Sequence, residues 1–120
     1  MAEEHKIEVF EVVGSGLCVA SDDGQKVHDD IAEALRRGLK VKLSFQNVQT
    51  LTSAFLNAAI GQLYGEFAEE QIKSSLTITA LDRDDMALLR RVVETAKQYF
   101  KEADRVREAR KAVLGEDNES

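Results

Sequence analysis

The side chains most capable of chemistry are one cysteine, two histidines and several paired aspartates. Cys18 lies in an apolar run, which favours a buried thiol over a nucleophile, because thiolate chemistry requires a cationic, partly open setting. His5 and His28 have no serine or cysteine partner that the sequence identifies. The aspartate pairs fit helix starts and a solvated face better than the spacing of a divalent-metal loop. We therefore expect no catalytic residue, no metal site and no cofactor.

The segment from residue 40 to residue 63 is more informative. A buried strand runs into a short polar turn that contains Asn47 and Gln49, and Thr52 and Ser53 then stand where a helix begins. The free N–H groups of such a helix start attract anions. Phosphorylation there would add about −1.5 to −2 charges and change which partner fits. The plainer interpretation is an ordinary helix cap, and the spacing by itself favours that cap.

Composition and charge exclude several classes of function. A chain of 120 residues is about one domain. Its net charge of −6 argues against nucleic-acid binding. Residues 1–70 hold 12 acidic and 6 basic side chains, whereas residues 71–120 hold 10 of each. The sequence has no apolar run near the roughly 18 residues that a membrane helix needs. The polar start is unlike a secretory signal, so we expect a cytoplasmic protein.

Hydrophobic periodicity predicts alternating strands and helices. We expect strands over 7–13, 17–20, 40–45 and 76–80, and helices over 22–38, 53–64 and 84–113. The first two strands would form a hairpin through the turn Gly14-Ser15-Gly16. The order implies an α/β fold: a mixed sheet of about four strands, three helices mainly on one face, and a long C-terminal helix. We expect one domain over residues 1–114 and a disordered polar tail over 115–120.

These elements and motifs resemble the STAS-like family of small bacterial domains of unknown function, which is related to anti-sigma factor antagonists. That family tends to show a strand ending in a Leu-Asp-Phe-like motif, then a Val, then a Thr/Ser-Ser-Ser-Phe helix start. The matching text here is Leu43-Ser44-Phe45, Val48 and Leu51-Thr52-Ser53-Ala54-Phe55. The order of elements over residues 10–100 is also similar.

The resemblance implies a protein-binding, non-enzymatic regulatory role. In antagonist STAS domains, a partner kinase of the GHKL ATPase fold phosphorylates a serine at the start of the second helix, and this weakens binding. This chain departs from the pattern at two positions: Ser44 replaces the acidic residue, and Ala54 stands at the position that best matches the phosphorylated serine. A phosphorylation switch at Thr52 or Ser53 and a constitutive docking surface therefore both stay open.

Two functions from different classes follow. The leading hypothesis is a regulatory module that docks on a protein partner, of the GHKL-type ATPase class, through loop 46–52 and the start of the next helix. The candidate contact residues are Asn47, Gln49, Thr52, Ser53 and Phe55. The alternative is a module that binds a small anion or a nucleotide at the same helix start. Homodimerisation, through the end of the last helix or an open sheet edge, stays undecided by the sequence.

Overall fold

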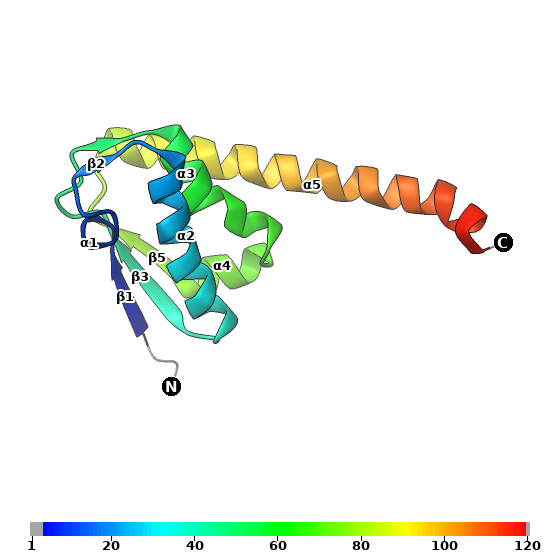
Figure 1. Ribbon diagram of the computed structural model, residues 1–120, viewed down its shortest axis with the longest axis horizontal. Coiled ribbons are helices and arrows are strands. Elements are labelled where there is room, and N and C mark those ends of the chain that lie inside the picture. The colour runs from blue at the N-terminus through cyan, green and yellow to red at the C-terminus, as the bar shows by residue number, and fades with distance from the viewer. Residues whose placement is uncertain (1–3, 120) are drawn as a thin grey trace.

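The computed structural model describes residues 4–119 and the side-chain surroundings of residues 4–107 and 109. Five strands, five α-helices and one 3-10 helix follow one another in this part of the chain (Figure 1). Their order is β1 (Glu4–Glu8), α1 (Val9–Val13), β2 (Leu17–Cys18), α2 (Ser21–Arg36), β3 (Lys40–Ser44), β4 (Thr50–Leu51), α3 (Ser53–Ala59), η1 (Gly61–Gly65), α4 (Glu69–Ser75), β5 (Leu76–Thr79) and α5 (Arg83–Glu119).

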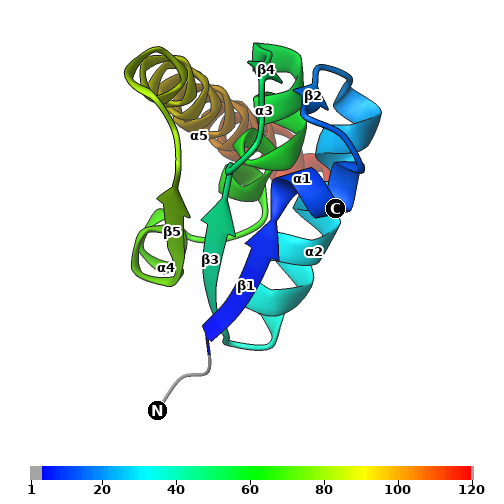
Figure 2. The ribbon, with the colours of Figure 1, turned by 90° about the vertical axis from the view of Figure 1, so that its left-hand side faces the viewer.

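The main sheet has three parallel strands in the order β1-β3-β5. Parallel pairing follows from the sequence, because a helical crossover separates each strand from the next one in the sheet. Ile7, Leu43 and Ile78 share one row of the register and point to the core, whereas the row of Lys6, Lys42 and Thr77 belongs to the other face. Figure 2 shows the strands of the main sheet in front, α2 behind them and α3 beyond the ends at which their arrows point, so no helix covers the face toward the viewer.

The core forms where α2 and α3 pack together behind this sheet. Val27, Ile31 and Leu35 give α2 a fully buried face. Gly24 makes a close approach between the helices possible: a methyl group there would lie 2.5 Å from the carbonyl oxygen of Phe55 and 2.9 Å from the Cβ of Ala58. The glycine therefore sets the spacing of α2 and α3, and with it the position at which α3 begins.

The structure confirms the α/β class, the long C-terminal helix and helices gathered on one face, and it corrects the strands. The predicted strand over 7–13 ends at Glu8, and Val9–Val13 form the short helix α1. The reason is visible in the sequence: a helical turn places Val9, Val12 and Val13 on one face, and all three pack toward the core. A strand would have directed Val12 and Val13 to opposite faces.

The predicted hairpin is also wrong. Gly14 ends α1 with a φ of 83°, instead of turning the chain between two strands. The strand that follows, β2, pairs in parallel with β4 in a separate two-stranded sheet. All strand pairings in the described part of the chain are thus parallel, so the predicted mixed sheet of about four strands is replaced by a parallel sheet of three and a parallel pair.

Two further differences concern the second half of the chain. The helix predicted over 53–64 ends at Ala59 and continues as the 3-10 turn η1. The charged connection after it contains the helix α4, which buries Ile72.

At the C-terminus, α5 packs on the globule through Leu89, Val92 and Ala96 and then projects away from it (Figure 1). The domain limit at residue 114 and the disordered tail over 115–120 stay predictions, and Ser120 lies outside the described residues.

Among residues 4–119, no helix has both the length and the apolar composition that crossing a membrane requires.

The contact at Gly24 gives a testable prediction for stability. Replacing a glycine inside a helix by alanine usually stabilises the protein by about 0.5–1 kcal/mol. Here the added methyl group has no room, so we expect Gly24→Ala to lower the free energy of unfolding by about 1–3 kcal/mol. Chemical denaturation checks this, with the exposed Asp30→Ala on the same helix as the control. An unchanged or higher stability for Gly24→Ala would show that α2 and α3 are not locked at this spacing.

Candidate functional site

The candidate site lies where two loops meet. One is the loop between α1 and β2, and the other is loop 46–52, which precedes α3. Gly16 accepts hydrogen bonds at its carbonyl from the N–H groups of Gln49 (2.8 Å) and Thr50 (3.1 Å). A side chain at Gly16 would lie 2.7 Å from the carbonyl oxygen of Asn47, so only glycine fits this close approach. The N–H of Thr52 then donates to the carbonyl of Cys18 at 3.2 Å. Loop 46–52 is thereby fixed along β2.

Thr52 joins this loop to α3. Its hydroxyl donates to the carbonyl oxygen of Val19 at 2.7 Å and accepts from the N–H of Phe55 at 3.2 Å. The second bond is that of a helix cap, so the predicted cap is confirmed at Thr52. Both functions of the hydroxyl are in use, which makes Thr52 a structural residue in this fold.

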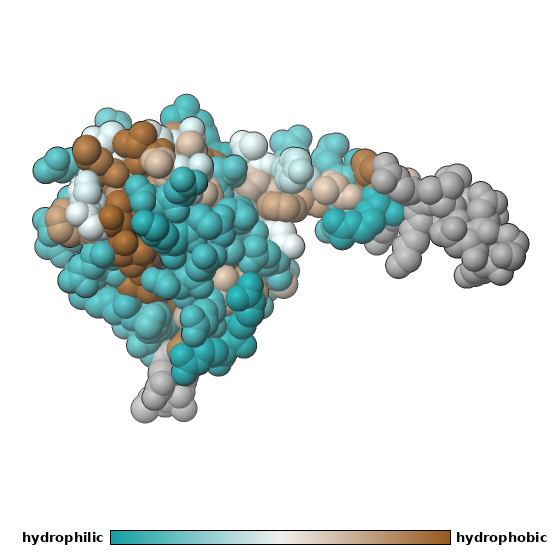
Figure 3. Space-filling model, viewed as in Figure 1, coloured by the Kyte–Doolittle hydropathy of each residue, from teal (hydrophilic) through white to brown (hydrophobic). Residues whose placement is uncertain are grey.

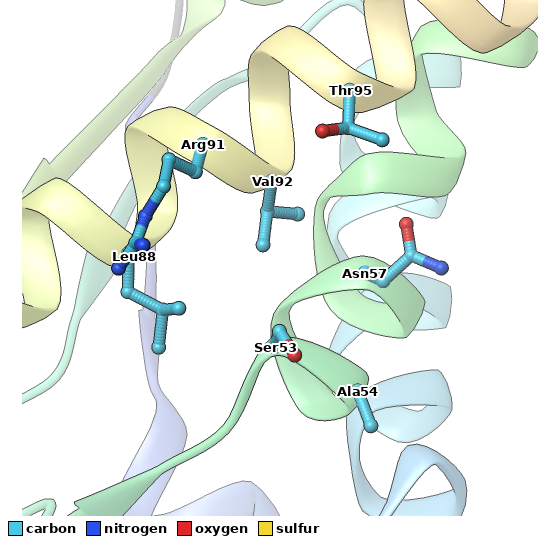
Figure 4. Close-up of a pocket in the computed structure, with 7 residues that line it drawn as sticks. All are labelled: Ser53, Ala54, Asn57, Leu88, Arg91, Val92 and Thr95. Carbon is cyan, nitrogen blue, oxygen red and sulfur yellow. The ribbon is translucent and has the colours of Figure 1, made fainter.

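Ser53 is the exposed hydroxyl of the pair and opens onto a pocket. The pocket has a volume of about 500 Å³ and is lined by Ser53, Ala54 and Asn57 of α3 and by Leu88, Arg91, Val92 and Thr95 of α5. Figure 4 shows Val92, Leu88 and Ser53 around the space between the two helices, with the guanidinium of Arg91 beside Leu88. The pocket thus has the hydroxyl of Ser53 on the α3 wall and the guanidinium of Arg91 on the α5 wall, and a guanidinium is a group that pairs with phosphate.

The other predicted contact residues differ in their exposure to solvent. Asn47 and Gln49 are exposed on the loop, and Asn47 adopts a φ of 69°, which asparagine tolerates better than most residues. Phe55 is fully buried in the core behind the loop. Phe55 therefore supports the site from inside and is not accessible to a partner, in contrast to its predicted place in the contact.

The sequence-based prediction missed two exposed apolar residues at the same place. Leu17 and Val19 keep 57% and 45% of their surface exposed, whereas Cys18 between them is fully buried. Figure 3 shows apolar surface at the end of the globule that carries β2. The signal was present in the run Leu17-Cys18-Val19-Ala20, because a strand with one buried face must expose the alternate residues.

Of the other reactive side chains, His28 and Cys18 are enclosed, whereas His5 is exposed at β1. His28 is buried, with Nε2 2.9 Å from Glu66 Oε2 and Nδ1 3.0 Å from Asp29 Oδ1. Hydrogen bonds from His28 and Gln25 hold the pKa of Asp29 below its usual value. Burial, with a smaller contribution from Asp23, raises the pKa of the Cys18 thiol to about 11, so the thiol is protonated at neutral pH. His28 thus ties α2 to the segment after η1, and Cys18 behaves as the predicted core thiol.

Comparing Thr52 with its neighbour tests this assignment of roles. We expect Thr52→Ala to lower the free energy of unfolding by about 1–2 kcal/mol, because the cap and the bond to Val19 are both lost. Ser53→Ala makes a matched control, and we expect a change within about 0.5 kcal/mol. Urea denaturation of both variants measures the difference. Equal losses would mean that the hydroxyl of Thr52 does not hold the loop to α3.

Comparison with known proteins adds one positive finding. Neither the curated proteins nor the solved structures contain a match to this chain. The family described as a STAS-like domain of unknown function matches residues 23–86, which is more than half of the chain. The match runs from the start of α2 to the start of α5, so it includes loop 46–52, Thr52 and the pocket wall at Ser53. The chain therefore belongs to the family of STAS-like domains of unknown function.

Proposed function

We propose that this protein is a regulatory binding module, not an enzyme, and that it docks on a protein partner through one end of the globule. The docking surface comprises the exposed residues Leu17, Val19, Asn47, Gln49 and Ser53. A bacterial cytoplasm and a partner of the GHKL-type ATPase class are parts of the same proposal, and they rest on the resemblance to antagonist STAS domains.

The observation that carries the proposal is the exposure of Leu17 and Val19 beside the predicted docking loop. Large apolar side chains gathered on a surface favour a protein contact, because covering them removes apolar area from water. The backbone beneath them is held by β2–β4 pairing and by the Thr52 hydroxyl. A surface held in this way loses little conformational entropy on binding, which favours affinity.

Charge supports a partner with a basic face. Asp22 and Asp23 follow Val19 closely at the start of α2, and the whole acidic excess of the chain lies in residues 1–70. Complementary charge speeds the encounter with a partner and suppresses wrong ones. A basic contact face on the partner is therefore favoured over an acidic one.

Ser53 is the residue at which phosphorylation would act on this surface. It is exposed, whereas the hydroxyl of Thr52 is engaged on both sides. Phosphate at Ser53 would add about −1.5 to −2 charges to the docking surface itself, at the pocket that Arg91 also lines. The added charge would alter the docking surface without removing an interaction that holds the fold together.

The enclosure of His28 and Cys18 supports the non-enzymatic part of the proposal. The ring nitrogens of His28 both face carboxylates, and the thiol of Cys18 is buried and protonated. A catalytic nucleophile or base must instead reach its substrate.

The two exposed valines provide a controlled test. A photo-reactive amino acid at position 17 or 49 should crosslink to one partner, which is identified by mass spectrometry and then purified. We expect Val19→Asp to weaken the affinity for that partner at least about tenfold, because a charge would have to be buried in the contact. Val106→Asp, at a valine of comparable exposure on α5 (55% against 45% for Val19), serves as the control. Val106 lies outside the docking surface, so the affinity of a single chain for the partner should be unchanged.

Two results would contradict the proposal. The first is an unchanged affinity for Val19→Asp. The second is crosslinking that succeeds only from positions on the open face of the sheet, such as Thr77.

The alternative function, binding of a small anion or a nucleotide, can be tested at Arg91. A guanidinium in the pocket beside Ser53 is a group that binds phosphate or a nucleotide. The helix itself offers little, because α3 has only seven residues. If an anion binds in the folded state, nucleotides should raise the melting temperature of the protein and fail to do so for Arg91→Gln.

A further inference from the structure

The projecting part of α5 carries an apolar face that continues from the core into solvent. Val92 and Ala96 are buried against the globule, with 8% and 4% of their surface exposed. Tyr99 and Val106, on the same side of the helix, are 64% and 55% exposed. Figure 3 shows apolar atoms along the part of α5 that lies outside the globule.

The spacing of these residues is that of a helix-pairing seam. Val92, Ala96, Tyr99, Ala103 and Val106 follow one another at intervals of four, three, four and three residues. This repeat of seven places one apolar stripe along a helix and is the pattern of coiled coils. Tyr99, Ala103 and Val106, called the α5 seam below, line a hollow of about 390 Å³ together with Glu102 and Arg107. A facing helix would fill this hollow.

Charges beside the seam indicate what that helix is. Glu102 and Arg107 flank the seam on its two sides, at the positions that meet across a coiled coil. In a parallel pair of identical helices, Glu102 of each chain faces Arg107 of the other. Arg107 lies 3.4 Å from Asp104 in the single chain, but that pair is highly exposed and contributes little. A copy of the same helix therefore complements the seam in both shape and charge.

Other occupants fit less well. The exposed residues around the seam carry charges of both signs: Lys101 and Arg105 are basic, and Glu102 and Asp104 are acidic. A membrane surface or a nucleic acid prefers a basic face, whereas the charged residues that line the seam in the described part of α5 are one acid, Glu102, and one base, Arg107.

We propose that the α5 seam pairs with the α5 seam of a second copy of this chain, with the two helices running in the same direction. The protein is then a dimer that carries two docking surfaces. This inference does not rest on the proposed function, because it uses residues at the other end of the molecule.

Sedimentation velocity of the full chain over a range of concentrations tests the pairing. The wild-type chain should form a dimer, and Val106→Glu should raise the dimer dissociation constant at least about tenfold, because a carboxylate would be placed in the seam. Lys101→Gln changes the net charge by the same amount on the opposite side of α5 and should leave the dimer intact. Circular dichroism confirms that each variant keeps its helices.

A charge exchange tests the direction of the helices. Glu102→Arg and Arg107→Glu should each weaken the dimer, and the double variant should restore it, since the facing pairs are then opposite in charge again. A wild-type chain that stays monomeric, or a Val106→Glu dimer as tight as the wild type, would overturn the proposal. Loss of the dimer in both single variants without recovery in the double variant would overturn the parallel arrangement.

Discussion

The hydroxyl of Thr52 is the interaction on which the candidate site depends. It joins the end of β2, through the carbonyl of Val19, to the first turn of α3, through the N–H of Phe55. These segments are more than thirty residues apart in the chain and belong to different layers. Because one side chain bonds both, the exposed apolar residues of β2 and the exposed serine of α3 become neighbours on one surface. Without this bond, β2 would be held beside the start of α3 by its short ladder with β4 and by the bond from the N–H of Thr52 to the carbonyl of Cys18.

The packing of α2 against α3 gives that surface its support. Gly24 lets the helices approach so closely that a methyl group there would lie 2.5 Å from the carbonyl oxygen of Phe55. The ring of Phe55 then fills the core behind the loop. On the other side of α3, α5 closes the pocket with Arg91 and continues as a free helix. The same helix thus completes the globule with one part and presents a seam with the other. Under the two proposals, partner docking and self-association therefore use different ends of the molecule.

Periodicity was sufficient for the long elements and insufficient for the short ones. The faces of α2 and α5 and the alternation in β3 and β5 are explicit in the sequence, because each spans enough residues to show its period. Val9–Val13 are only five residues, and their apolar pattern fits a helical turn as well as an irregular strand. The pairing of β2 with β4 could not be predicted either, because strands of two residues are too short to show a period. Contacts between loops, such as the hydrogen bonds to the carbonyl of Gly16, hold these strands together. The roles of Thr52 and Ser53 also required the fold, because adjacent hydroxyls look alike until one of them is seen to be bonded.

The central claim is that β2, loop 46–52 and the start of α3 act as one docking surface. Hydrogen–deuterium exchange of the full chain, alone and bound to its crosslinked partner, tests it most directly. The account predicts that binding slows amide exchange in residues 15–19 and 46–56 together and leaves the open face of the main sheet unchanged. Protection confined to the main sheet, or protection of one of the two segments without the other, would contradict it.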